Sequence, residues 1–201
     1  MVGDPLITHP DGHDYEILHM PGYRQPQNAP ECIYYAIWIT LQYVANEYPD
    51  EGVRDSTNPV KLDTIRDYIE IGQNGWENVG QAPLTQISAE VESLSLNLEY
   101  RYNGFPQTIG EFASDGLSEL LPTIVLVDHL LLEQGKRGEG PLHAVVVCGV
   151  GEEYITIEDP LVEGTTTLEI DKLDEAWDPE YNTAIEVGLR NGLEPTRREE
   201  L

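Results

Sequence analysis

Apolar residues are dense from Pro30 to about Glu47, and their spacing predicts a helix that lies in the core. Pro30 is acceptable in the first turn of a helix, and Asn28 or Ala29 would be the cap. Pro49 follows the predicted end. One face would be formed by Ile33, Ala36, Ile37, Leu41 and Val44, widened by Tyr34, Trp38 and Ile39. The first turn of this central helix would hold Cys32.

Three further segments have helical spacing. An amphipathic helix is predicted over Pro59–Ile71, with Gly72 just after its end. A third helix would start with Pro83 at its first position and place Leu84, Ile87, Val91 and Leu94 on one side. A short helix is predicted over Thr108–Leu117.

The second half of the chain has the pattern of strands. A continuous apolar run from Pro122 to Val127 is followed by a polar, glycine-rich loop over 133–140. A β-hairpin is predicted from His143–Cys148 and Tyr154–Glu158, which flank residues 149–153. Further strands are expected at 96–102, 165–170 and 184–189, with a helical turn at 173–177. Helices followed by an antiparallel sheet indicate an α+β fold.

A chain of 201 residues is most simply one domain. We expect an irregular arm over 1–22, the folded domain over 23–189 and a charged tail over 190–201. The histidines of the arm, His9, His13 and His19, could be taken for a metal site. Pro10 and Gly12 make this segment typical of turns, and the ligand spacing of a metal site is absent. We therefore expect no metal and no cofactor.

The net charge is −26, from 37 acidic and 11 basic residues. Such a chain would repel phosphates, which argues against non-specific binding of nucleic acid. The acidic residues are spread along the chain rather than collected in a tail. A uniformly acidic surface with few lysines favours adaptation to high salt, where self-repulsion is screened. A cationic partner is the alternative interpretation.

The two cysteines, Cys32 and Cys148, do not make a disulfide framework. A signal peptide is not visible at the start of the sequence. The longest apolar run, Leu117–Leu132, is interrupted by charged residues and a proline and cannot cross a bilayer. These observations predict a cytoplasmic protein, and they leave its oligomeric state open.

The predicted hairpin brings His143 and Asp159 to opposite ends of its two strands, each eight residues from Gly151. With the turn centred on Gly151, the two residues would be directly opposed and share a face of the sheet. Val145 would then pair with Ile157 and Val147 with Ile155. Cys148 would point to the other face, which indicates a structural role.

Cys32, His143 and Asp159 together have the residue types of a thiol-dependent acyl-transfer site. A cysteine in the first turn of a helix favours the thiolate. A histidine forms the ion pair with it and later protonates the leaving amine, and an acceptor orients the ring. A glutamine before the cysteine can donate to the oxyanion, and both Gln27 and Gln25 are candidates.

The sequence resembles the papain-like bacteriocin-processing (double-glycine leader) peptidases, family C39, and their stand-alone C39-like relatives. The resemblance is carried by Gln-Asn-Ala-Pro-Glu-Cys32, the strand Pro122–Val127, His143-Ala-Val-Val-Val-Cys-Gly149, Ile155-Thr-Ile-Glu-Asp159-Pro160 and Leu173–Trp177. It covers about residues 23–188. It implies a papain-like fold, with N-terminal helices packed on a C-terminal antiparallel sheet. It also implies an enzyme that hydrolyses a peptide bond of a peptide or protein substrate.

By position, the resemblance implies Cys32 as nucleophile, His143 as general base and acid, and Asp159 as orienting acceptor. The oxyanion glutamine of the family lies about six residues before the cysteine, where this chain has Pro26, and we prefer Gln27 to Gln25. The family usually has glycine directly after the cysteine, where this chain has Ile33. A bulky residue there could narrow the cleft, so a catalytically inactive peptide-binding module on the same fold is the alternative function.

Overall fold

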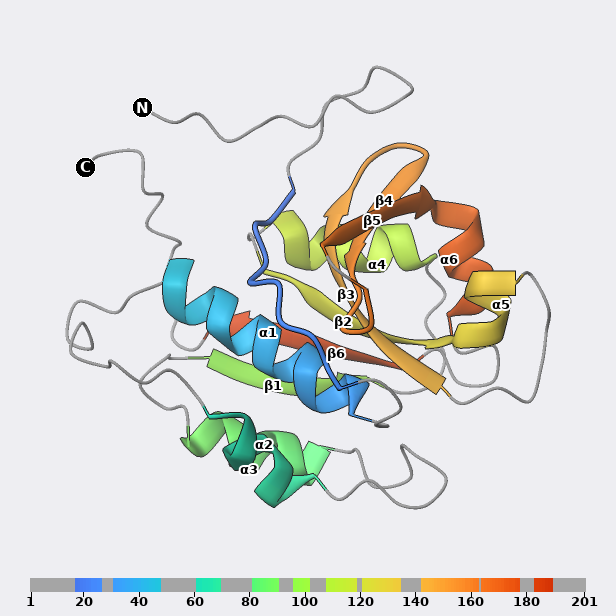
Figure 1. The fold of residues 1–201 in the computed structure, drawn as a ribbon. Coiled ribbons are helices and arrows are strands. Elements are labelled where there is room, and N and C mark those ends of the chain that lie inside the picture. Colours follow the sequence, from blue (N-terminus) through green and yellow to red (C-terminus); the bar gives the residue numbers. More distant parts are fainter. Residues whose placement is uncertain are drawn as a thin grey trace, which may run out of the picture.

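A six-stranded antiparallel sheet forms the centre of the computed structural model, with the strand order β1-β6-β2-β3-β4-β5 (Figure 1). The structure describes residues 17–26, 31–47, 61–69, 81–90, 96–101, 108–118, 121–134, 142–162, 164–177 and 183–189. The strands are β1 (Leu96–Arg101), β2 (Thr123–Asp128), β3 (Leu142–Val150), β4 (Tyr154–Glu158), β5 (Thr165–Glu169) and β6 (Ala184–Leu189).

Helices cover both faces of this sheet, in three layers. One face carries α1 (Cys32–Glu47), α2 (Leu62–Tyr68) and α3 (Gln81–Glu90), whose apolar residues share one core cluster. The other face carries α4 (Ile109–Ser118), α5 (His129–Gln134) and α6 (Ile170–Ala176), which form a second cluster. Along β2, Ile124 and Leu126 belong to the first cluster, whereas Val125 and Val127 belong to the second. The predicted fold class, N-terminal helices packed on an antiparallel sheet, is confirmed.

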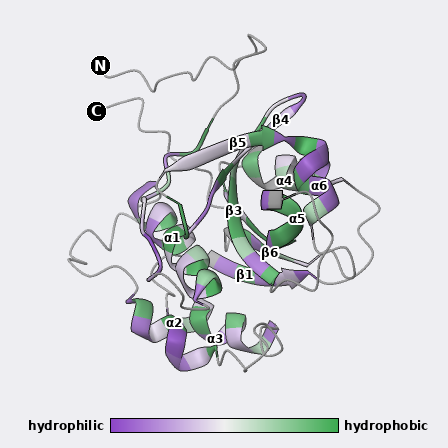
Figure 2. Ribbon diagram, turned by 45° about the vertical axis from the view of Figure 1, so that its right-hand side comes forward, coloured by the Kyte–Doolittle hydropathy of each residue, from purple (hydrophilic) through white to green (hydrophobic). Residues whose placement is uncertain are grey.

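Burial on both faces explains the composition of β2 and β3. Every residue of β2 is buried, as are the residues of β3 between its two ends. A strand covered on both sides has no polar face, so its sequence is a continuous apolar run. Figure 2 shows β3 almost wholly in the hydrophobic colour.

The helix predictions hold with three differences, of which the first is that the helix predicted over Pro59–Ile71 spans Leu62–Tyr68, because Lys61 and Ile69 have extended backbone. The central helix runs from Cys32 to Glu47, close to the predicted range. The third helix begins at Gln81, so the prediction that Pro83 is its first residue is wrong by two positions. Pro83 still lies in the first turn, where a backbone N–H has no helical partner to lose. The short helix α5 was not predicted, and Asp128 begins it by accepting the N–H of Leu131 at 3.0 Å.

The register of the β3–β4 hairpin differs from the predicted one. Val147 pairs with Ile157 rather than with Ile155, and a bulge shifts the register between Val147 and Gly149. The direct pairing predicted for His143 and Asp159 is therefore wrong. The turn lies beyond Gly151, so that Val150 pairs with Ile155, and the one extra residue of the bulge takes back one position; β4 is therefore displaced by two positions at this end. His143 and Asp159 still share a face, because a shift by two keeps the parity of a strand.

Residues 17–26, which we call the strap, run alongside α1 towards its N-terminal end (Figure 1). The strap begins with a β-bridge between Ile17 and Gly149. Its Leu18 N–H donates to the carbonyl of Cys148 at 2.8 Å. The ring of Tyr23 stacks on Trp38 of α1, with centroids 4.1 Å apart. The strap is thus attached to both β3 and α1.

Several predictions lie outside the described residues. These are the cap of the central helix, Gln27, the first 16 residues with His9 and His13, and the tail over 190–201. The domain boundaries and the cytoplasmic location stay predictions. Within the ranges that the structure describes, we find no helix with the length and apolar character needed to span a bilayer.

Candidate active site

His143 and Asp159 form a buried ion pair at one end of the β3–β4 hairpin. His143 is the second residue of β3, and Asp159 directly follows β4. The distance from Nε2 of His143 to Oδ1 of Asp159 is 2.7 Å. The same Oδ1 accepts the backbone N–H of Leu161 at 2.8 Å, which fixes the carboxylate. Asp159 therefore fixes the imidazole of His143 through Nε2, and Nδ1 stays available for another partner.

Cys32 is the first residue of α1, and its thiol lies near enough to His143 to raise the pKa of that imidazole. Since Nε2 of His143 is engaged by Asp159, Nδ1 is the nitrogen left for the thiol. The start of a helix carries a partial positive charge, which favours a thiolate there. The structure thus brings together Cys32, His143 and Asp159, three residues from separate parts of the sequence.

The electrostatics of His143 follow from these two partners. Burial by itself lowers the pKa of His143, but the hydrogen bonds and charges of Asp159 and Cys32 outweigh it and raise the pKa to about 9. For Asp159 burial acts to raise the pKa, but the hydrogen bond and charge of His143 dominate and lower the pKa. Both shifts favour an imidazolium next to a carboxylate. An imidazolium beside Cys32 is the state that stabilises a thiolate.

Gln25 is the candidate glutamine that the structure describes. It is buried, and its backbone N–H donates to the carbonyl of Pro160 at 3.0 Å, one residue beyond Asp159. This bond attaches the C-terminal part of the strap to the loop after β4. Gln27, the glutamine that we preferred from the sequence, lies outside the described residues.

A second histidine lies against the first, and its contact was not predicted from the sequence pattern. The rings of His129 and His143 meet edge to face, with centroids 5.0 Å apart and an angle of 66° between their planes. Nε2 of His129 lies 3.3 Å from Oε2 of Glu133 in the next turn of α5. Strand pairing explains the contact, because Val127 pairs with His143 and His129 follows two residues later.

Glu158, the neighbour of Asp159, was also not predicted as a site residue. It is 2 % exposed, and its side chain points to the opposite side of β4 from Asp159. Burial raises the pKa of Glu158 to about 7, assisted by the charge of Asp159 and opposed by that of Arg24. The available signal was an acidic residue at the end of a strand whose preceding residues, Ile155, Thr156 and Ile157, are apolar or uncharged.

Ile33 and Cys148 both belong to the apolar core that α1 shares with the sheet. Ile33 is 1 % exposed, so its side chain does not line an open cleft next to Cys32. Cys148 is fully buried, and its thiol lies 3.4 Å from the carbonyl oxygen of Thr156. Burial raises the pKa of the Cys148 thiol strongly. Of the two cysteines, only Cys32 lies beside His143.

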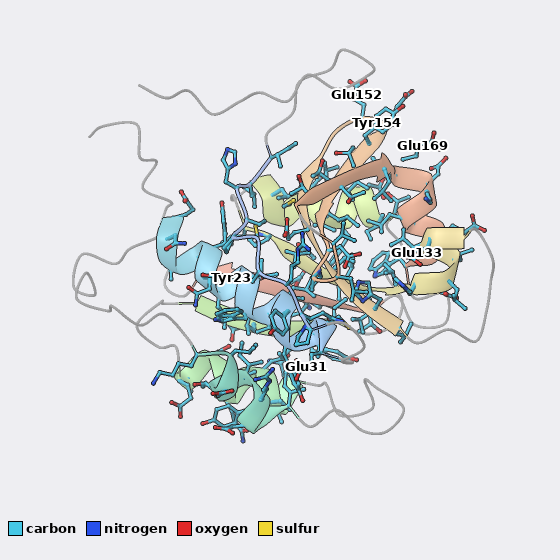
Figure 3. The ribbon with its side chains drawn as sticks, in the orientation of Figure 1. Tyr23, Glu31, Glu133, Glu152, Tyr154 and Glu169 are labelled. Carbon is cyan, nitrogen blue, oxygen red and sulfur yellow. The ribbon has the colours of Figure 1, made fainter. Side chains whose placement is uncertain are left out.

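An ion pair joins the start of α1 to α2. Both carboxylate oxygens of Glu31, the residue before Cys32, lie 2.9 Å from one nitrogen of Arg66 (Figure 3). A cavity of about 550 Å³ lies elsewhere, at the tip of the β3–β4 hairpin near Glu152, Tyr154 and Glu169. It does not include any residue of the candidate site.

In the described part of the chain, no cluster of three or more metal-ligating side chains occurs.

Comparison with sequence families yields no matching family model, and no curated protein matches the chain. Solved structures do match. A putative C39-like peptidase from Bacillus anthracis is 17% identical, with a TM-score of 0.61, over 89% of this chain and 99% of that one. A double glycine motif protease from an AMS/PCAT transporter, in complex with its leader peptide, is 16% identical, with a TM-score of 0.55, over 86% and 94%.

The peptidase domain of Streptococcus ComA, a bifunctional ABC transporter of a quorum-sensing pathway, is 17% identical. Its TM-score is 0.51, and the match covers 86% of this chain and all (100%) of that domain. Identities this low say nothing about individual residues, but the matches span nearly the full length of each neighbour. The chain therefore has the fold of the C39-like peptidases.

Proposed function

We propose that this protein is a cysteine peptidase that hydrolyses a peptide bond through Cys32, His143 and Asp159. The observation that carries the proposal is that His143 lies between Cys32, which acts on its pKa, and Asp159, to which it is hydrogen-bonded. The nucleophile, the base and the orienting group of a papain-like site stand in the order that the chemistry requires.

In the proposed reaction the Cys32 thiolate attacks the carbonyl carbon of the scissile bond. The C–N bond then breaks, and the imidazolium of His143 gives its proton to the leaving amine, which leaves a thioester on Cys32. Water, deprotonated by His143, attacks the thioester and releases the carboxylic acid product. Asp159 keeps Nδ1 of His143 directed at the sulfur throughout. An amine in place of water would give acyl transfer through the same thioester.

We assign the oxyanion donor to Gln25, together with the backbone N–H of Cys32. Gln25 is buried and attached to Pro160, directly beyond Asp159, and this supports a place near the reacting carbonyl. A donor that is already fixed stabilises the oxyanion without reorganisation. Gln27 is the alternative donor.

A peptide or protein is the proposed substrate class. One structural neighbour was solved in complex with a leader peptide, so this fold accommodates a peptide in that protein.

One observation favours the second candidate function, a peptide-binding module without activity. Cys32 is 7 % exposed and His143 is 4 % exposed, so little of either group is open to a substrate carbonyl. A peptide would then bind on the surface of the fold without reaching the sulfur. Binding that survives Cys32→Ala, with no product formed by the unmodified protein, would establish this function instead.

Alkylation by iodoacetamide separates the two functions at the level of the thiol. We expect Cys32 to react at pH 7 at least tenfold faster than a free thiol, because the proposed mechanism pairs it with the imidazolium of His143. Cys148 is the internal control and should stay unlabelled until the protein unfolds. Cys32→Ala and His143→Ala should abolish turnover while the circular dichroism spectrum is unchanged. A Cys32 that reacts no faster than free cysteine would refute the peptidase proposal.

The acidic composition supports adaptation to high salt as a second, separate proposal. With 37 acidic and 11 basic residues, the folded chain is self-repelling at low ionic strength. Screening by molar salt removes most of this repulsion, because the Debye length falls to about 3 Å at 1 M.

A further inference from the structure

A buried carboxyl group lies beneath the strap. Glu158 is the last residue of β4, and its Oε1 has no hydrogen-bond partner among the residues that the structure describes. A Cβ added at Gly22 would lie 4.0 Å from this oxygen, so the strap passes directly over the carboxyl. Burial of a carboxylate without a donor is costly, whereas the neutral acid is tolerated.

The strap is attached to the sheet on both sides of Glu158. On one side the Leu18 N–H donates to Cys148, and on the other the Gln25 N–H donates to Pro160. Gly22 lies between these two bonds. Gln25 follows three residues after the point where the strap crosses Glu158, so a displacement of the strap there would move Gln25 as well.

Ionisable groups face Glu158 from three elements. Asp159, on the same segment, disfavours a second negative charge, and Arg24 of the strap favours it. On β3 the thiol of Cys148 lies within reach of the charge of Glu158, which contributes to its raised pKa. The direct strand partners of Glu158, Val146 on β3 and Thr165 on β5, carry no charge. Burial outweighs Arg24, so the neutral form is favoured under the closed strap.

We propose that Glu158 is a positioning residue that seats Gln25 through the strap, closing the strap when neutral and loosening it when ionised. This inference rests on the proposed function, because that function is what gives the position of Gln25 its chemical meaning. Gly22 fits the role, since a larger residue over the carboxyl would lie against its oxygen.

The sign of the effect follows from linkage. With the strap open, Glu158 is in water and ionises near its ordinary pKa of 4.5, whereas under the closed strap its pKa is about 7. The ratio of open to closed strap therefore increases as the pH rises from about 4.5 to about 7. In the middle of this window the ratio increases by close to tenfold per pH unit. Above about pH 7.5 the effect levels off.

Hydrogen exchange at Gln25 measures this directly, because its N–H is bonded to Pro160 only when the strap is seated. In the unmodified full chain, the protection factor of this amide, corrected for intrinsic exchange, should fall several-fold to tenfold per pH unit between pH 5.5 and 6.5. In Glu158→Gln, which keeps the shape and cannot ionise, the protection factor should not change over this range. Glu153→Gln, an exposed position in the same hairpin, is the matched control and should behave as the unmodified chain does.

Two reactions of Cys32 provide the functional readout. Acylation by p-nitrophenyl acetate forms a thioester, releases p-nitrophenolate and passes through an oxyanion, whereas alkylation by iodoacetamide forms no oxyanion. At pH 8, Glu158→Gln should raise the acylation rate about threefold or more and leave the alkylation rate within a factor of two. A substitution that only altered packing would change both rates together.

Each result decides one claim. Equal pH courses of Gln25 protection in Glu158→Gln and the unmodified chain would overturn the inference, as would parallel changes in acylation and alkylation. If Glu158→Gln does not fold, Glu158→Met supplies a second side chain that cannot ionise. An inert Cys32 in the unmodified chain would instead remove the proposed function, and the exchange experiment would still decide whether Glu158 controls the strap.

Discussion

Nε2 of His143 and Oδ1 of Asp159 lie 2.7 Å apart, although the register of their strands offsets the two residues by two positions. The contact is therefore diagonal rather than between directly opposed residues. A diagonal contact of this kind needs a long side chain. The length of the imidazole spans the offset, and the Leu161 N–H holds the carboxylate in place.

Asp159→Asn should slow the reaction of Cys32 with iodoacetamide at pH 7 by about tenfold or more. The amide keeps the size of the side chain but removes the charge that raises the pKa of His143 against the effect of burial. With a neutral His143 the thiolate loses its counterion. Stopped-flow alkylation compared with Asp128→Asn, a buried aspartate outside the His143 pair, would check this. An unchanged rate would mean that Asp159 does not set the charge of His143.

The stability of the protein should fall at alkaline pH because of His143. Its pKa is raised from 6.5 to about 9 in the folded state, so the stabilisation is complete below pH 6.5 and is lost as the pH rises through 9. The contribution is about 3 kcal/mol, at the conversion of about 1.4 kcal/mol per pH unit. Urea denaturation between pH 6 and 10 would measure it. In His143→Gln this part of the pH dependence should disappear, and its persistence there would contradict the assignment.

Ile33→Ala should destabilise the fold by about 2–5 kcal/mol, the usual cost of removing a buried isoleucine. The side chain belongs to the core, so its removal should not widen a cleft or speed the alkylation of Cys32. Thermal unfolding and the alkylation rate test the two parts separately. A large gain in reactivity with little loss of stability would show that Ile33 instead obstructs the thiol.

The melting temperature should rise steadily with KCl from 0.1 M to 3 M. At a net charge of −26, screening removes a repulsion that acts across the whole surface. The Glu31–Arg66 pair should contribute little to this response, because partly exposed ion pairs are worth about 0–1 kcal/mol. A melting temperature that is equal in salt-free buffer and in 3 M KCl would refute adaptation to high salt.

Which segments are buried could be predicted from the order of apolar and polar residues. The spacing of apolar residues and the local composition predicted the buried helix α1, the buried strand β2 and the hairpin that starts near His143. This is possible because burial selects residue type locally. The likeness to C39-like peptidases rested on the same local features. Cys32, His143 and Asp159 could be singled out for the same reason, since few residue types perform this chemistry.

The way in which these residues meet depends on long-range packing and strand register, which local patterns do not specify. A turn beyond Gly151 and a bulge after Val147 together changed the pairing of His143 from direct to diagonal, and a one-residue insertion leaves almost no trace in an apolar strand. The contact of His129 with His143 depends on the register of β2 against β3, which pairs Val127 with His143. Likewise, Glu158 acquires its unusual environment from the strap, a segment more than 130 residues earlier that covers it only in the folded chain.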